Sequence, residues 1–329
     1  MTLPRVAITM GDAAGIGPEI VLKALVDGTI SQICQPVIMG DLQYLKKEAA
    51  RFVPTLTLRG IDEHGGSDST RVDDLGNLPG EFEIGVDAAV TGKASAQYIE
   101  RAVKLWRDGQ IDAIATAPIS KKAISLGGYT FPGHTEFLAA LTGTERVAMS
   151  FFGGDLRVVL LSTHISLRHA IEQVKRDKLV DLIIFANAQL ARLLKKTPKL
   201  AMAGLNPHAS EGGMFGTEEH EEITPAIEIC RNKHGIDVAG PYSPDTIFLR
   251  AHRGEFDAVI ACYHDQATIP VKSISFGSSV NVTLGLPLIR TSVDHGTAFD
   301  IAGKGIADPS SMQAAIRLAA ELAMSEPPA

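Results

Sequence analysis

Hydrophobic positions along the chain alternate between two periods. Short β-branched runs, such as RVAIT at residues 5–9 and PVIMG at 36–40, are each followed by a longer segment with apolar residues at helical spacing. A short apolar run bounded by turn residues predicts a buried strand, and the amphipathic segment after it predicts a helix. This alternation is typical of a mostly parallel β-sheet with helices on both faces.

The same alternation continues to the end of the chain. The further predicted elements are helices at 88–109, 179–196 and 311–325 and strands at 112–118, 147–152, 156–163 and 199–207. One acidic, turn-rich stretch, residues 63–81, has no apolar period and predicts a surface loop or arm. No Pro- or Ser-rich linker separates independent modules. We therefore predict two interleaved α/β domains, residues 1–130 plus 295–329 and residues 131–294, with a cleft between them.

Composition and charge exclude several classes of function. The 329 residues include 31 Lys+Arg against 38 Asp+Glu, a net charge of −7, so no basic surface for nucleic acid is expected. The cysteines Cys34, Cys230 and Cys262 are far apart and form no CxxC pair, as in reduced cytoplasmic proteins. No segment approaches the ~20 apolar residues that span a bilayer, and the N-terminus lacks a signal-peptide pattern. We expect a cytoplasmic protein with neither nucleic-acid nor membrane partners.

Three predicted strands are each followed by a histidine: His164, His208 and His264. In open α/β sheets the carboxyl ends of strands face the ligand crevice, and three imidazoles are a common ligand set for Zn²⁺. Their spacing matches no short metal motif, and a single histidine of this kind is more often a hydrogen-bonded structural residue. Asp245 and Asp265 would either orient the imidazoles or cap helices.

Other residues in these segments suit an anionic ligand. His134 and Thr135 follow a glycine at the start of a predicted helix, where backbone N–H groups favour phosphate or carboxylate. Thr135 as a simple N-cap is the alternative. Lys272, Asn281 and Arg290 would together hold a phosphate and a carboxylate, although surface Lys and Arg often do no more than interact with water.

A glycine turn lies near each end of the chain. The first, ITMGDAAGIGPEI, lacks G-x-G-x-x-G, and Pro18 and Glu19 make a good helix start without any ligand. The second, HGTAFDIAGKGIADP at 295–309, resembles the adenine-binding loop of the isopropylmalate and isocitrate dehydrogenases, and GIGPEI resembles the glycine turn that opens those chains. That resemblance implies their fold and a nicotinamide cofactor bound without a Rossmann fold. The residues that it implies for the cofactor are His295, Gly296, Ala298 and Asp300. A carboxylate at Asp300 would repel a 2′-phosphate and favour NAD over NADP.

An ordered series of motifs narrows the resemblance. The series is MGDAAGIGPEI, TAPISKKAI, PGHTEF, STHISLR, GLNPHASEGGMFGTEE, YHDQATIPVK and NVTLGLPLIRTSVDHGTA. Over essentially the whole chain it resembles the 4-hydroxythreonine-4-phosphate dehydrogenase family. The resemblance implies a homodimer whose metal site takes histidines from both subunits. It implies metal ligands at His164, His208 and His264 and substrate binding by His134, Thr135, Lys272, Asn281 and Arg290.

The resemblance also implies a reaction. Members oxidise and decarboxylate 4-phosphooxy-L-threonine to 3-amino-2-oxopropyl phosphate and CO₂ with NAD, in pyridoxal 5′-phosphate biosynthesis. The expected metal is Zn²⁺, with Mg²⁺ or Co²⁺ as alternatives. Lys272 is a candidate proton carrier, as is a water oriented by Asp245 or Asp265.

Two departures from the family pattern leave the substrate open. Ala13 stands where the family usually has proline, and Ser120 stands where the TGPVHKG form has histidine. The TAP form of this motif also occurs in a branch that resembles D-threonate or D-erythronate 4-phosphate dehydrogenases of sugar-acid catabolism. These substrates are one alternative, and a cyclic dihydrodiol acid is another. A binding protein that has lost the reaction is a third, although all eight site positions are retained.

Overall fold

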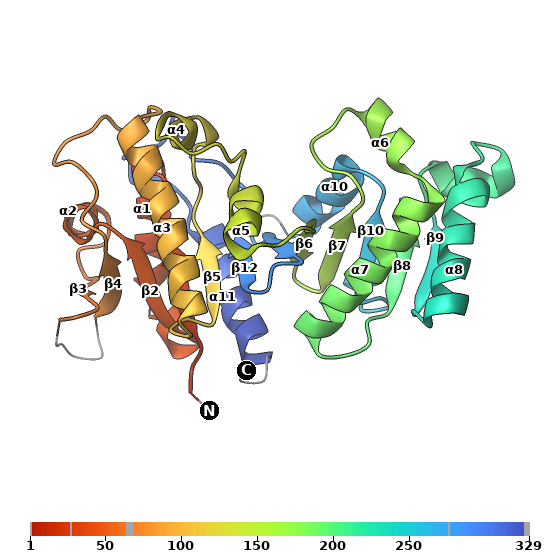
Figure 1. Cartoon of the computed structure of the whole chain (residues 1–329), viewed down its shortest axis with the longest axis horizontal. Helices are drawn as coiled ribbons and strands as arrows, with labels where there is room; N and C mark the ends of the chain where they lie inside the picture. The colour runs from red at the N-terminus through yellow and green to blue at the C-terminus, as the bar shows by residue number, and fades with distance from the viewer. Residues whose placement is uncertain (1, 27, 64–68, 276, 326–329) are drawn as a thin grey trace. The chain divides into compact units, whose positions relative to one another are not determined.

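The computed structural model describes residues 2–26, 28–63, 69–275 and 277–325 (Figure 1). The chain divides into two compact units: unit 1 is Met1–Arg146 with Leu286–Met324, and unit 2 contains Val147–Gly285. The predicted division differs from this one over residues 131–146 and 286–294. These segments belong to unit 1 because the helix that begins at His134 contacts the helix Ala89–Arg107 and the strand that carries Arg290 pairs with the strand Ala113–Thr116.

Unit 1 contains a parallel sheet. Its strands are β1 (Arg5–Thr9), β2 (Gln35–Gly40), β3 (Leu58–Gly60), β4 (Thr70–Asp74), β5 (Ala113–Thr116) and β12 (Ile289–Ser292), in the order β3-β4-β2-β1-β5-β12. All of these neighbours pair in parallel. The central strands β1 and β5 are almost wholly buried, which explains why their sequences are apolar runs without alternation.

Helices cover the sheet of unit 1. They are α1 (Gly17–Leu25), α2 (Leu42–Phe52), α3 (Ala89–Arg107), α4 (Lys121–Leu126), α5 (His134–Thr142) and α11 (Ser310–Ser325), with a short 3₁₀ turn at Ile30–Gln32. Figure 1 shows α3 crossing the near face of this sheet, where it contacts β1 and β2. The predicted helices at 88–109 and 311–325 are confirmed.

The predicted loop at 63–81 is wrong in part. Thr70–Asp74 forms β4, which pairs with β2 and β3. Of the three buried residues of this strand, only Val72 is apolar, and the other two are the polar Thr70 and Asp73. Asp73 is buried with a partner, since Arg101 donates to its carboxylate at 2.7 Å. Residues 64–68 lie outside the described part of the chain.

Unit 2 contains a mixed sheet. Its strands are β6 (Ala148–Gly153), β7 (Leu156–Leu160), β8 (Leu200–Ala203), β9 (Val238–Tyr242), β10 (Ala258–Ala261) and β11 (Val280–Leu284), in the order β11-β6-β7-β10-β8-β9. Strands β7, β10, β8 and β9 are parallel to one another, whereas β11, β6 and β7 pair antiparallel. The predicted α/β class with mostly parallel strands is confirmed.

The helices of unit 2 follow its strands. They are α6 (Leu167–Gln173), α7 (Arg176–Leu194), α8 (Thr224–His234), α9 (Ile247–His252) and α10 (His264–Ile274), with short helical turns at Pro207–Gly213 and Glu219–Ile223. Figure 1 shows α7 and α8 on the near face of the sheet and α10 on the far face. Within the described residues, no helix is both long and apolar enough to cross a membrane.

Candidate functional site

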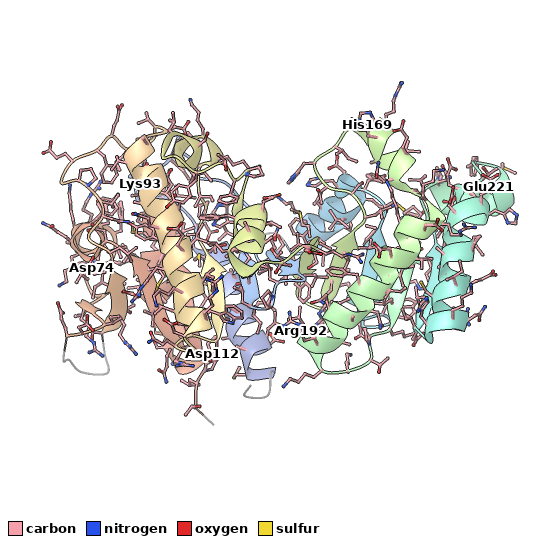
Figure 2. All side chains as sticks on the ribbon, in the orientation of Figure 1. Asp74, Lys93, Asp112, His169, Arg192 and Glu221 are labelled. Atoms are coloured by element: carbon pink, nitrogen blue, oxygen red, sulfur yellow. The ribbon has the colours of Figure 1, made fainter. Side chains whose placement is uncertain are left out.

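Three neighbouring parallel strands place the histidine segments at one edge of unit 2. Strand β10 lies between β7 and β8, with Val259 opposite both Val158 and Ala201. The segments that follow these strands therefore leave the sheet at the same edge, as the strand-end pattern predicted. Figure 2 draws the side chains there, with His169 of α6 and Glu221 of the turn Glu219–Ile223 labelled on the segments that follow β7 and β8.

His164 and His264 face each other across this edge. Their ring centroids are 5.6 Å apart, at an interplanar angle of 46°. His264 begins α10, and its Nδ1 lies 2.7 Å from Oδ1 of Asp265, which leaves Nε2 available for a ligand. Both rings line a hollow of about 230 Å³ together with Thr163, Tyr263 and Asp265.

His208 lies in the turn after β8. Its Nδ1 is 3.7 Å from Oδ2 of Asp245, whose Oδ1 accepts a hydrogen bond from Ser243 at 2.5 Å. Asp245 lines a second hollow of about 500 Å³ that shares Tyr263 and Asp265 with the first. Asp265 thus lies at hydrogen-bond distance from Nδ1 of His264, the arrangement that orients metal-binding imidazoles, and Asp245 lies near Nδ1 of His208.

The geometry of His164 and His264 fits two positions in the coordination of one metal ion. Two imidazoles on a tetrahedral Zn²⁺ have ring centroids about 5 Å apart, close to the 5.6 Å observed. Among the residues that the structure describes, no group of three or more His, Cys, Asp or Glu side chains in one chain is arranged to hold a metal. Within a single chain, His208 therefore does not complete a set of ligands with the other two.

The remaining candidates in unit 2 lie on elements that pack together. Lys272 is in the last turn of α10 and is exposed. Asn281 is on β11, which pairs with β6, and α10 contacts β6. Lys272 and Asn281 therefore lie on two elements that both contact β6.

His134 and Thr135 begin α5 in unit 1. The N-cap of this helix is Gly133, which makes no side-chain cap, so the interpretation of Thr135 as an N-cap is wrong. The Nε2 of His134 is buried without a hydrogen-bond partner among the described residues. Burial and the nearby charge of Arg290 hold the pKa of His134 well below its ordinary value, so the ring is neutral at pH 7.

Arg290 is buried on β12. Its guanidinium donates to Oγ1 of Thr116 at 2.9 and 3.3 Å. Burial lowers the pKa of Arg290 to about 9, and the carboxylate of Glu136 opposes that shift. A buried guanidinium binds an anionic ligand through strong, charge-assisted hydrogen bonds. The start of α5 and Arg290 therefore form an environment suited to a phosphate or a carboxylate.

The two glycine turns meet in unit 1. Thr297 O accepts from Ile16 N at 3.0 Å, and a Cβ at Gly15 would lie only 2.9 Å from that oxygen. Glu19 is buried and accepts from the backbone N–H groups of Gly305 at 3.2 Å and Ala307 at 2.8 Å. The first turn thus holds the segment 295–309 in place, a role that its local sequence did not reveal.

The predicted cofactor residues lie along that segment. Ala298 has a positive φ of 42°, and Asp300 is exposed. The Nδ1 of His295 lies 3.0 Å from Gly296 O, and its Nε2 is buried without a hydrogen-bond partner within the described ranges. The segment therefore carries polar side chains, and its backbone contains a left-handed residue at Ala298.

Ser120, which departs from the TGPVHKG form, is the N-cap of α4. Its hydroxyl accepts from Ala123 N at 3.1 Å and contacts the carboxylate of Asp87. Sequence reasoning missed Asp87, which lies in a turn before α3 and has no motif around it. It also missed Asn206, Glu218 and Glu219 beside His208, although all three lie in the quoted motif GLNPHASEGGMFGTEE.

Comparisons with known proteins agree with this architecture. The family model for pyridoxal phosphate biosynthetic protein PdxA matches residues 32–319. A D-threonate 4-phosphate dehydrogenase of Cupriavidus necator is 48% identical over 98% of this chain and 98% of its own length. A 4-hydroxythreonine-4-phosphate dehydrogenase of Desulforapulum autotrophicum is 45% identical over 96% of this chain and 95% of its own length.

A solved structure gives the same result for the fold. The crystal structure of 4-hydroxythreonine-4-phosphate dehydrogenase from Klebsiella pneumoniae has a TM-score of 0.89 and 42% identity, covering 97% of this chain and 99% of that one. Each of these relatives is a dehydrogenase. The chain is therefore an oxidoreductase, and it belongs to the family of pyridoxal phosphate biosynthetic protein PdxA.

Proposed function

We propose that the protein catalyses the NAD-dependent oxidative decarboxylation of 4-phosphooxy-L-threonine to 3-amino-2-oxopropyl phosphate and CO₂, in pyridoxal 5′-phosphate biosynthesis. In this reaction the C3 hydride passes to NAD⁺ and the hydroxyl proton is released. The β-keto acid then loses CO₂, and the electron pair left at C2 takes up a proton. The observation that carries the proposal is the facing pair His164 and His264 in a chain of this family.

The metal would be held by His164, His208 and His264, with Zn²⁺ expected and Mg²⁺ or Co²⁺ as alternatives. When bound, a divalent ion polarises the oxygen on C3 and favours both steps. Asp265 and Asp245 would orient the rings of His264 and His208 through Nδ1.

A homodimer would supply the third ligand from the partner subunit. Around the two hollows of unit 2 a set of large apolar side chains is exposed: Ile165, Leu167, Leu249 and Ile269. Apolar side chains gathered next to a polar site mark a surface for association. A shared site is consistent with the lack of a three-ligand group among the described residues of one chain.

Substrate would be bound by His134, Thr135, Lys272, Asn281 and Arg290. Arg290 suits a carboxylate or phosphate because its planar guanidinium binds two oxygens at once. The neutral ring of His134 can donate one hydrogen bond to the ligand without adding a charge to the site. Lys272 is the proposed proton carrier, since Asp245 and Asp265 already contact histidine rings. Replacing Lys272 with Met should lower turnover far more than NAD binding.

The cofactor would be NAD rather than NADP, bound by His295, Gly296, Ala298 and Asp300. The exposed carboxylate of Asp300 can accept from ribose hydroxyls and repel a 2′-phosphate. We place the enzyme in the cytoplasm, since Cys34, Cys230 and Cys262 are all buried and unpaired thiols.

D-Threonate 4-phosphate is a second candidate substrate. It differs from 4-phosphooxy-L-threonine in carrying a hydroxyl instead of an amino group at C2. The Cupriavidus necator relative with 48% identity is named for it, and Ser120 departs from the TGPVHKG form. D-Erythronate 4-phosphate belongs to the same class.

The test is a substrate panel with the zinc-loaded enzyme. NADH absorbance is followed with 4-phosphooxy-L-threonine, D-threonate 4-phosphate and D-erythronate 4-phosphate, each with NAD and with NADP. A kcat/KM at least tenfold higher for the first compound supports the proposal, and the reverse order establishes the second candidate. An enzyme that binds zinc and NAD yet reduces NAD with none of them would contradict both.

A further inference from the structure

The turn that carries His208 has an unusual backbone. His208, Ala209, Ser210 and Glu211 have φ values of 52°, 52°, 68° and 45°, all in the left-handed region. Non-glycine residues enter this region singly as a rule, because Cβ then crowds the backbone. Four in succession require neighbouring groups that fix the conformation.

Three side chains supply that constraint. Asn206 N donates to Oε1 of Glu219 at 2.7 Å, and Asn206 Nδ2 donates to Oε2 of Glu219 and to Oε2 of Glu218, each at 2.8 Å. We call Asn206, Glu218 and Glu219 the Asn206 clamp. Glu219 is 3% exposed, so its bonds to Asn206 are charge-assisted and shielded from water.

Two glycines pack closely against the clamp and the turn. A Cβ at Gly216 would lie 2.6 Å from Nδ2 of Asn206 and 2.7 Å from Oε2 of Glu218. On the other side of the turn, a Cβ at Gly204 would lie 2.9 Å from Cα of Ala209. Both glycines allow the chain to approach the clamp where any other residue would collide.

The clamp lies immediately before the predicted metal ligand. Asn206 precedes Pro207 and His208 and is the N-cap of the turn. Because the clamp determines how the backbone leaves Asn206, it also determines where the imidazole of His208 is presented. The ring of His208 then lies with its Nδ1 3.7 Å from Oδ2 of Asp245.

We propose that Asn206, Glu218 and Glu219 are positioning residues for the metal site, holding the left-handed turn so that His208 is ready to bind. This inference rests on the proposed function of His208 as a ligand. Without the clamp, the turn relaxes to other backbone conformations and only a fraction of molecules presents His208. The apparent metal affinity then falls in proportion to that fraction.

The test compares three variants of the full-length protein. Glu219→Gln keeps the shape of the side chain. It replaces one of the two oxygens that accept from Asn206 with an NH₂ group, which can only donate. Asn206→Ala removes the amide that bridges the two glutamates. Glu222→Gln is the matched control, because Glu222 lies on the same helical turn but bonds Lys175 and the backbone of Arg176 instead.

Zinc affinity is measured by competition with a chelator, and cobalt-loaded samples are compared by their visible absorption. We expect Glu219→Gln and Asn206→Ala to weaken zinc binding by about 10- to 100-fold and to shift the cobalt spectrum toward that of His208→Ala. Glu222→Gln should match the wild type. Melting curves and molecular mass establish that each variant is folded. If Glu219→Gln does not fold, the zinc affinity of Asn206→Ala tests the positioning role.

The outcomes separate the clamp from the metal site itself. If the wild type binds zinc and His208→Ala does not, but both clamp variants bind like the wild type, the clamp has no positioning role. If His208→Ala and the wild type bind zinc equally, His208 is no ligand. That result overturns the proposed metal site, and the inference with it.

Discussion

The imidazole rings of His164 and His264 lie with their centroids 5.6 Å apart, although one follows β7 and the other follows β10. Parallel pairing of these two strands brings the rings together. We predict that His164→Ala and His264→Ala each weaken zinc binding at least about 100-fold, more than loss of an orienting group does. Metal content after dialysis against a chelator measures this effect.

His234→Ala serves as the control for the histidine variants. His234 is exposed in the last turn of α8 and should retain the wild-type zinc content. Equal zinc content in all four proteins would remove the facing histidines from the metal site.

Arg290 connects substrate binding with pH and stability. Its pKa is lowered to about 9 by burial, so above about pH 9 the unfolded chain, with an ordinary Arg pKa, binds more protons than the folded one. The cost of burying this charge is therefore fully present below pH 9 and declines as pH rises above it. We predict that Arg290→Met abolishes turnover but unfolds, at pH 7.5, with a free energy equal to or about 1 kcal/mol above the wild type.

The same shift predicts how the wild-type enzyme behaves at high pH. As pH rises through about 9 in the absence of substrate, Arg290 should lose its charge, and KM for the phosphorylated substrate should increase. Urea unfolding of both proteins at pH 7.5 and pH 10, beside KM values over the same range, measures both effects. A large loss of stability in Arg290→Met at pH 7.5 would contradict this account of the charge.

Glu19 ties the predicted cofactor segment to α1. Its carboxylate binds Gly305 N, Ala307 N and Lys23, whose ammonium also donates to Gly305 O and Ala307 O. We predict that Glu19→Gln raises KM for NAD about tenfold, because loss of a charge-assisted buried hydrogen bond costs about 1.5–3 kcal/mol locally. Zinc affinity should not change.

Asp112→Asn is the comparison for Glu19→Gln. Asp112, labelled in Figure 2, precedes β5 at the opposite edge of the sheet and accepts from Arg5 at 2.9 Å. This variant should lose some stability while KM for NAD stays at the wild-type value. An unchanged KM for NAD in Glu19→Gln would show that the segment 295–309 needs no such support.

Ile269 tests the proposed dimer surface. It is 63% exposed on α10 and lines the larger hollow beside Asp265. We predict that Ile269→Asp yields a monomer with reduced zinc content, because a buried charge is unfavourable in an apolar interface. Light scattering and metal analysis measure both properties.

Leu126→Asp is the matched control for Ile269→Asp. Leu126 is 55% exposed on α4 of unit 1, a different unit from the one that carries the predicted metal ligands. This variant should remain dimeric. Full zinc content in a monomeric Ile269→Asp protein would show that one chain alone holds the metal.

The sequence located the strands before the histidines well, because buried parallel strands are apolar on both faces. Their ends were less accurate, since β7 and β8 end at Leu160 and Ala203 rather than at the predicted residues 163 and 207. The runs that end before His164 and His264 need no knowledge of the partner strand to be recognised. Strand β4 was missed because two of its three buried residues, Thr70 and Asp73, are polar, and Arg101, the partner of Asp73, is distant in the sequence. The need for a glycine at position 15 could not be predicted from the local sequence either, because Thr297, which approaches Gly15, lies near the other end of the chain.

The backbone at His208 could not be predicted either. Left-handed residues are expected at glycine and, less often, at asparagine, aspartate or histidine, whereas Ala209, Ser210 and Glu211 carry no such signal. Their conformation depends on Glu219, which follows in the chain and is a good helix former elsewhere. Only the folded turn shows that this carboxylate faces Asn206.

The six strands of unit 2 all come from the single stretch Val147–Gly285, whereas unit 1 takes β12 from beyond that stretch. During synthesis, unit 2 can complete its own sheet while β5 of unit 1 still lacks β12, its partner strand on one side. Because Ala113–Thr116 is an apolar strand, that open edge invites pairing with other chains until residues 289–292 emerge. We therefore expect truncation before β12 to cause aggregation, even though every histidine of the proposed metal site has already been made.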